Sequence, residues 1–163
     1  MTESKQKDNP EINLSWADIH LRMNQLATAL GFWKLQRAKP CIVAIGRGGL
    51  APAVILSNML GVPIAHVVFV KTYKGKENVG AKLTELGAIP QKMVKDCIFV
   101  DDLVDTGSTF EAVKAKYPDA KFVTPYAKIE GFNKYKNDFL FEPPVIYEQN
   151  SWLVFPWERS WSH

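Results

Sequence analysis

The sequence predicts an α/β domain in which helices flank a mostly parallel sheet. Short apolar runs, rich in β-branched residues, alternate along the chain with segments whose apolar residues recur at helical spacing. Glycine and proline residues lie between the two kinds of segment, as they do where strands and helices end. The length of 163 residues and the 47% hydrophobic content fit one domain with a buried core. We therefore expect residues 14–163 to form one domain, preceded by a flexible arm at residues 1–13.

The predicted elements follow one another in a regular order. Ser15 and Asp18 form a capping-box pair at the start of a first helix, which Gly31 is placed to end. The other predicted elements are strands at residues 41–45, 65–70, 97–100 and 121–126, and helices at residues 52–60 and 109–117. Because strands and helices alternate, the strands should pair in parallel, with right-handed crossovers.

Residues 74–95 interrupt this alternation. They contain three glycines, a proline and several lysines, with little periodic apolar character. A connection of that length in a small domain is often a functional lid, so we expect a flexible lid here. The tail beyond Phe139 is rich in aromatic residues, and we expect Trp157 and Trp161 to pack in the core or at a subunit interface.

Composition and charge exclude several classes of protein. A net charge of +3 is too small for a protein that coats nucleic acid. Cys41 and Cys97 each begin an apolar run, which indicates two buried thiols and not a disulfide framework. The sequence contains no CxxC motif, so a structural zinc site is not indicated. The polar first residues and the lack of a long apolar run predict a cytoplasmic protein with no transmembrane segment.

An acidic and hydroxyl-rich segment follows the strand at residues 97–100. Its residues are Asp101, Asp102, Leu103, Val104, Asp105, Thr106, Gly107, Ser108 and Thr109. Ligands of open α/β sheets bind beyond the carboxyl ends of the strands, where this segment lies. The turn at residues 106–109 can direct N–H groups and hydroxyls at a phosphate, while adjacent carboxylates suit ribose or Mg²⁺. The alternative is an ordinary acidic turn. The order of the segment, with acids first, then the turn and then a helix, favours the ligand site over this alternative.

A second glycine-rich turn follows the strand at residues 41–45. Gly46, Arg47, Gly48 and Gly49 can present N–H groups and a guanidinium to an anion. For this loop alone an ordinary turn is equally consistent. Together with the acidic segment, it predicts two anion sites at one edge of the sheet.

These motifs resemble those of a known family. Residues 99–109 resemble the phosphoribosyl pyrophosphate (PRPP) motif of type I phosphoribosyltransferases, and residues 46–49 resemble their pyrophosphate loop. Residues 126–128 and 151–158 bring the chain closer to the bacterial xanthine-guanine branch, and the similarity spans residues 14–158. The resemblance implies the type I fold, with a flexible lid and a small C-terminal hood segment. It also implies a purine-salvage reaction, in which an oxopurine (xanthine, guanine or hypoxanthine) and PRPP give a nucleoside monophosphate and pyrophosphate.

The resemblance also implies roles for individual residues. PRPP would be held by Arg47–Gly49 and by all residues of the 101–109 segment, with Asp102 binding Mg²⁺. Asp105 would lie beside the purine imidazole and serve as the general base. Lys128 would donate to the exocyclic oxygen of the purine, and Trp152 and Leu153 would cover its ring. For Lys128 the alternative is a solvated lysine at a strand end.

The sequence departs from the family pattern at three places. Gly46 replaces a usual serine, Ser108 replaces a common glycine, and the lid contains no arginine, so that Lys76 or Lys82 would have to supply its charge. An alternative is therefore a PRPP- or nucleotide-sensing regulator that binds RNA or a protein. A further alternative is an enzyme of the same fold that acts on a pyrimidine or another base. Because members of this family are dimers or tetramers, the resemblance implies a homodimer or homotetramer. Some members lie at the inner face of the membrane, so a peripheral membrane position is an alternative to a purely cytoplasmic one.

Overall fold

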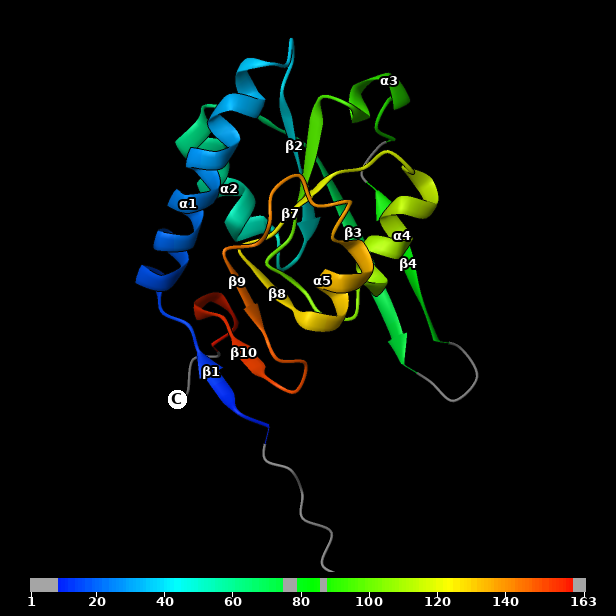
Figure 1. The fold of residues 1–163 in the computed structure, drawn as a ribbon. Helices are drawn as coiled ribbons and strands as arrows, with labels where there is room; N and C mark the ends of the chain where they lie inside the picture. The colour runs from blue at the N-terminus through cyan, green and yellow to red at the C-terminus, as the bar shows by residue number, and fades with distance from the viewer. Residues whose placement is uncertain (1–8, 75–78, 86–87, 160–163) are drawn as a thin grey trace, which may run out of the picture.

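A five-stranded sheet forms the centre of the computed structural model, which describes residues 9–74, 79–85 and 88–159 (Figure 1). The strand order is β4-β3-β2-β5-β7, and the bounds are Cys41–Gly46 (β2), Ile64–Lys74 (β3), Val79–Glu85 (β4), Cys97–Val100 (β5) and Phe122–Val123 (β7). All neighbouring strands are parallel except β3 and β4, which are antiparallel. The predicted α/β class, with a mostly parallel sheet, is confirmed.

Helices cover both faces of this sheet. Helices α1 (Trp16–Leu35) and α2 (Leu50–Leu60) lie on one face, while α3 (Gln91–Val94) and α4 (Ser108–Lys116) lie on the other (Figure 1). Side chains alternate along β2, so that Ile42 and Ala44 pack in the core under α1 and α2, and Val43 packs in the core under α4. No helix within the described ranges is both long and apolar enough to cross a membrane.

Two smaller sheets lie in the lower half of Figure 1 and carry the C-terminal part of the chain. One contains the parallel strands β6 (Leu103–Val104), β8 (Tyr126–Lys128) and β9 (Val145–Tyr147). The other pairs β1 (Glu11–Asn13) in parallel with β10 (Trp152–Val154). Helix α5 (Ile129–Tyr135) follows β8 directly, and a 3-10 turn (Pro156–Glu158) follows β10.

The capping box at the start of α1 is confirmed, but the predicted end of that helix is wrong. The Ser15 hydroxyl accepts a hydrogen bond from the Asp18 backbone N–H (3.1 Å), and the Asp18 carboxylate accepts one from the Ser15 backbone N–H (2.8 Å). The helix passes Gly31 and ends at Leu35, because Trp33 continues its buried face. Gly61 ends α2 in the left-handed conformation (φ +61°), as predicted.

The strand predicted at residues 121–126 is two strands in different sheets. Residues 122–123 form β7 of the main sheet, and residues 126–128 form β8 of the smaller sheet. Pro125, between them, has no N–H to donate to a strand ladder, which fits an interruption at this point. Because the two strands belong to different sheets, Lys128 lies outside the main sheet and near the segment that begins at Asp101.

Part of the predicted lid is regular structure. Strand β4 occupies residues 79–85, pairs with β3 and forms the edge of the main sheet. Glu85, at its end, accepts hydrogen bonds from the side chains of Tyr117 and Lys116 and so ties β4 to the end of α4. Lys82 is exposed on β4, whereas Lys76 lies outside the described residues.

The predicted N-terminal arm does not extend to residue 13. Residues 11–13 form β1, and the carbonyl of Pro10 accepts a hydrogen bond from the Trp152 backbone N–H (2.9 Å). Leu14 continues the pairing by donating to the Val154 carbonyl. The pattern of a three-residue strand is too short to recognise without its partner. Residues 1–8 of the predicted arm lie outside the described part of the chain.

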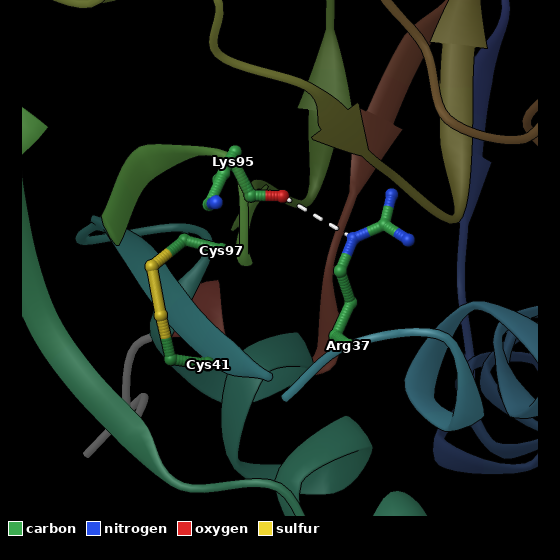
Figure 2. The surroundings of a disulfide bond; sticks show 4 residues. All are labelled: Arg37, Cys41, Lys95 and Cys97. Atoms are coloured by element: carbon green, nitrogen blue, oxygen red, sulfur yellow. Dashed lines mark hydrogen bonds between the residues drawn. A yellow bond between two sulfur atoms is a disulfide. The ribbon is translucent and has the colours of Figure 1, made fainter. Parts of the chain in front are cut away.

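The prediction of two buried thiols is also wrong, although both cysteines are buried. Cys41 and Cys97 are register partners at the starts of the adjacent strands β2 and β5, with Cα atoms 4.5 Å apart, and they form a disulfide. Figure 2 shows this bond beside the hydrogen bond from the Arg37 side chain to the Lys95 carbonyl. The separation of 56 residues along the chain gives no hint of pairing until the strand register is known.

Candidate active site

A cavity of about 710 Å³ lies where the carboxyl ends of β2 and β5 meet. Its lining includes the predicted residues Arg47, Gly48, Asp101, Asp102, Leu103 and Thr109. The remaining lining residues are Ile45, Gly46, Val70, Trp157 and Glu158. The two anion-binding motifs predicted for one edge of the sheet therefore face the same cavity.

The glycine-rich turn is packed directly against the acidic segment. A Cβ atom on Gly48 would lie 2.3 Å from an Asp102 carboxylate oxygen, and one on Gly49 would lie 2.2 Å from the Val100 carbonyl oxygen. A side chain at Gly49 would therefore meet fixed backbone, and one at Gly48 would require the Asp102 carboxylate to move. The Gly49 N–H donates to the Ile45 carbonyl (2.8 Å), which closes the turn at the strand end. Arg47 is exposed in this turn, where its guanidinium is accessible to an anion.

Two adjacent carboxylates, the buried Asp101 and the half-buried Asp102, follow the end of β5. Asp101 is 7% exposed, and its carboxylate accepts a hydrogen bond from the Asp102 backbone N–H (2.9 Å). Burial raises the pKa of Asp101 well above its usual value, and the neighbouring Asp102 charge raises it further. Burial also raises the pKa of Asp102 to about 6, against the lowering effect of its Asp101 hydrogen bond, and the Glu158 charge adds to the increase. Among the described residues no ion pair neutralises either carboxylate.

The hydroxyl-rich turn encloses a smaller hollow of about 70 Å³. Residues 103–110 line it, and Gly107 has a positive φ of +89° immediately before α4 starts. A Cβ on Gly107 would lie 2.3 Å from the Tyr135 ring, so this close approach also requires glycine. The N-terminus of α4 and the hydroxyls of Thr106 and Ser108 are thus at one place, as an anion site requires. Val104 is buried in β6, so only its backbone is available to a ligand there.

A second cavity, of about 180 Å³, adjoins the first. The two share Asp102, Leu103 and Glu158 in their linings. The second is also lined by Asp105, Lys128, Trp152, Leu153 and Phe155. All four residues predicted to contact a purine therefore surround one space, next to the space predicted for the ribose and pyrophosphate.

Lys128 and Asp105 form an ion pair in this second cavity. The Lys128 ammonium donates to Oδ2 of Asp105 (3.1 Å). The lysine side chain is 7% exposed, while that of Asp105 is 50% exposed. Lys128 is therefore not a solvated lysine at a strand end. Its ammonium has further N–H groups that can donate hydrogen bonds to a ligand in this cavity.

Strand β10 forms an aromatic and apolar wall of this cavity. Trp152 is 61% exposed, and Leu153 is buried. Trp157 stacks on Phe155, with ring centroids 4.8 Å apart, and is near Trp16. The expected packing of Trp157 against other residues is confirmed, with the addition that it lines the larger cavity, whereas Trp161 lies outside the described residues.

Sequence reasoning missed two polar residues of the site. Glu158 lines both cavities and accepts a hydrogen bond from the Phe155 backbone N–H (3.0 Å). Gln149 donates from Nε2 to Oδ1 of Asp105 (2.7 Å). Glu158 is the last residue of the 151–158 segment that resembles the family, so the sequence could have indicated it. Gln149 follows β9 in an irregular segment and offered none.

Known proteins share both the sequence pattern and the fold. The family model for the phosphoribosyl transferase domain matches residues 16–157. The xanthine-guanine phosphoribosyltransferase of Roseobacter denitrificans is 34% identical over 160 residues, which cover 91% of this chain and 85% of the relative. That of Idiomarina loihiensis is 32% identical over 155 residues, covering 92% and 88%. The crystal structure of purine phosphoribosyltransferase from Pyrococcus horikoshii matches with a TM-score of 0.69 and 28% identity, covering 94% and 97%. This chain belongs to the phosphoribosyltransferase family.

Proposed function

We propose that this protein transfers the phosphoribosyl group of PRPP to an oxopurine in purine salvage, releasing pyrophosphate. The Lys128–Asp105 pair carries the proposal, because it places a buried donor and an exposed acceptor in the cavity beside the PRPP motif. A purine with an exocyclic carbonyl accepts from the Lys128 ammonium. Adenine has an amino group at that position, so two donors would face each other. Xanthine, guanine and hypoxanthine are therefore the candidate substrates, and the first two appear in the names of the relatives.

The reaction is a displacement at the anomeric carbon of the ribose. A bond forms between that carbon and a purine imidazole nitrogen, while the bond to pyrophosphate breaks and its electron pair leaves with the pyrophosphate. Asp105 accepts the proton that the imidazole loses. Arg47 and the N–H groups of its turn stabilise the charge that grows on the pyrophosphate. Residues 106–109 hold the 5′-phosphate of the ribose.

The carboxylates of Asp101 and Asp102 fit a Mg²⁺ ion. Burial raises the pKa of both groups, so their ionised forms are unfavourable beside the cavity, and a bound cation would stabilise those forms. Mg²⁺ commonly takes one or two carboxylates and completes its shell with phosphate oxygens and water. Asp102 is the proposed ligand. When bound, the ion supplies positive charge to the leaving pyrophosphate.

A substrate panel tests the proposed function. The purified protein is incubated with PRPP, Mg²⁺ and guanine, xanthine, hypoxanthine or adenine, and nucleotide and pyrophosphate are measured. We expect turnover with an oxopurine, none with adenine, and loss of turnover when EDTA removes Mg²⁺. Retained PRPP binding with no turnover on any base would overturn the proposal and favour the sensing protein of the same fold.

Replacing Gly48 by Ala should impair PRPP use. The added Cβ would lie 2.3 Å from the Asp102 carboxylate, so that carboxylate must move from its place between the two motifs. We expect kcat/KM for PRPP to fall by about 10- to 100-fold, since displacements of about 1 Å have effects of this size. Gly31→Ala is the matched control, because a Cβ there meets nothing within 4 Å. Equal PRPP kinetics in both variants would contradict the role assigned to this contact.

Replacing Asp102 by Asn should stabilise the free protein as the pH rises. The folded-state pKa of Asp102 is raised from 3.8 to about 6, so the folded protein binds the proton more tightly than the unfolded chain does. The folded protein therefore loses stability as the pH rises from 3.8 through about 6. The variant should gain about 1–3 kcal/mol in free energy of unfolding above pH 7, relative to wild type, and little of this at pH 4.

Denaturant titrations at pH 4 and pH 7.5 measure this difference. Asp119→Asn, in an exposed turn, provides the same substitution away from the site. The prediction is wrong if the Asp102 variant shows no pH-dependent gain beyond that of the Asp119 variant. The stabilised variant should bind PRPP with Mg²⁺ more weakly, because it lacks the proposed ligand carboxylate.

A further inference from the structure

Gln149 connects the proposed catalytic carboxylate to the start of helix α5. It lies between β9 and β10, and its Nε2 donates to Oδ1 of Asp105 (2.7 Å). Its Oε1 accepts a hydrogen bond from the Glu130 backbone N–H in the first turn of α5 (3.1 Å). One side chain therefore bridges the start of a helix and the carboxylate that faces the purine cavity.

The chemistry at its two ends fixes the orientation of the Gln149 amide. The Glu130 backbone N–H can only donate, so it requires the amide oxygen. An ionised Asp105 carboxylate can only accept, so it requires the amide nitrogen. Rotating the amide by half a turn would break both hydrogen bonds, and Gln149 is thus held in one orientation.

The same helix start also holds the backbone of Asp105. The Gly131 N–H donates to the Asp105 carbonyl (2.9 Å). On the carboxylate, Lys128 donates to Oδ2 and Gln149 donates to Oδ1, so each oxygen has one protein donor. Half of the Asp105 side chain is exposed, and without these two donors it would be free to rotate in solvent.

We propose that Gln149 is a positioning residue for Asp105. It holds the plane of the carboxylate so that an unshared lone pair faces the purine imidazole. This inference rests on the proposed function, in which Asp105 accepts the imidazole proton. A proton acceptor must be within hydrogen-bond reach and correctly oriented, so loss of the Gln149 donor should slow the purine step and leave PRPP binding unchanged.

Two substitutions separate positioning from a structural role. Gln149→Glu keeps an oxygen for the Glu130 N–H but places a carboxylate against Asp105. Gln149→Met keeps the length of the side chain and removes both hydrogen bonds without adding charge. A positioning role predicts that the Glu variant is the poorer enzyme. A merely structural link between the β9–β10 segment and α5 predicts the reverse, since only the Glu variant retains the bond to Glu130.

The experiment measures kcat/KM for guanine at saturating PRPP, KM for PRPP, and the melting temperature of each variant. We expect kcat/KM for guanine to fall about 10-fold in Gln149→Met and about 100-fold in Gln149→Glu. KM for PRPP should match that of wild type, and the melting temperature of each variant should stay well above the assay temperature. Gln91→Glu, at the exposed start of α3, is the matched control for the added charge and should behave as wild type.

Calorimetric binding of guanosine 5′-monophosphate supplies a second readout. Its affinity should follow the order wild type, Gln149→Met, Gln149→Glu, while PRPP affinity stays constant. Wild-type guanine kinetics in the Glu variant, or equal losses for guanine and PRPP, would overturn the positioning role. If wild type transfers nothing to any purine, the proposed function fails. In that case the order of nucleotide affinities still tests whether Gln149 positions Asp105, separately from the proposed function.

Discussion

Replacing Asp105 by Asn is expected to lower kcat/KM for the oxopurine by about 10²–10⁴-fold, the range over which a positioned general base accelerates a reaction. The amide has nearly the shape of the carboxylate, so the cavity keeps its form. It cannot accept the imidazole proton, and it removes the charge that pairs with Lys128 across 3.1 Å. The loss should appear in kcat as well as in the purine KM.

Single-turnover measurements and PRPP calorimetry check this result. Asp105 borders the small hollow proposed for the 5′-phosphate, but its carboxylate is bonded to Lys128 and Gln149 and does not line the larger cavity, so PRPP affinity should change little. A variant that keeps kcat within threefold of wild type would show that another group, or solvent, takes the proton. A variant that loses PRPP affinity and purine turnover together would show that Asp105 acts on the ribose side.

Breaking the Cys41–Cys97 disulfide is expected to lower the free energy of unfolding by about 2–5 kcal/mol. The bond closes a loop of 56 residues, and in the chain-entropy view its loss gives the unfolded chain many more conformations. The cysteines lie at the starts of β2 and β5, whereas the proposed PRPP-binding motifs follow the ends of these strands. Activity well below the melting temperature should therefore be unchanged.

Urea titrations of wild type with and without dithiothreitol, and of a Cys41→Ala/Cys97→Ala double variant, measure this effect. The reduced wild type separates loss of the bond from the small cavities that the alanines leave. Alkylation of the unreduced, denatured protein counts its free thiols. Two labelled thiols, together with identical unfolding curves in both conditions, would mean that the cysteines are the buried thiols predicted from the sequence.

The parts of the site that the sequence predicts are those encoded in one continuous segment. Residues 46–49 and 101–109 each lie between a strand of the main sheet and the helix that follows it, so local chemistry indicates where their ligand lies. Parallel pairing of β2 and β5 then brings the two segments to one cavity without further information. The capping box of α1 and the αL glycine after α2 are local in the same sense.

The features that sequence reasoning missed depend on partners distant in the chain. Gln149 becomes part of the site only because β9 pairs beside β8, which aligns it with Asp105. The disulfide likewise depends on the register of β2 against β5. Strand β4 was missed for a different reason: its partner β3 directly precedes it, but its lysine-rich segment has little apolar character and is equally compatible with a loop.

The pairing of β1 with β10 has a consequence for the order in which the protein folds. Most of the larger cavity is lined by residues 45–109, which are close together in the sequence. The wall formed by Trp152 and Leu153 is hydrogen-bonded to residues 10–13, from the opposite end of the described chain. Contacts between such distant segments must overcome the entropy of closing a long loop and tend to form late. We therefore expect a chain emerging from the ribosome to assemble most of the proposed phosphate-binding half before it completes the proposed pocket for the base.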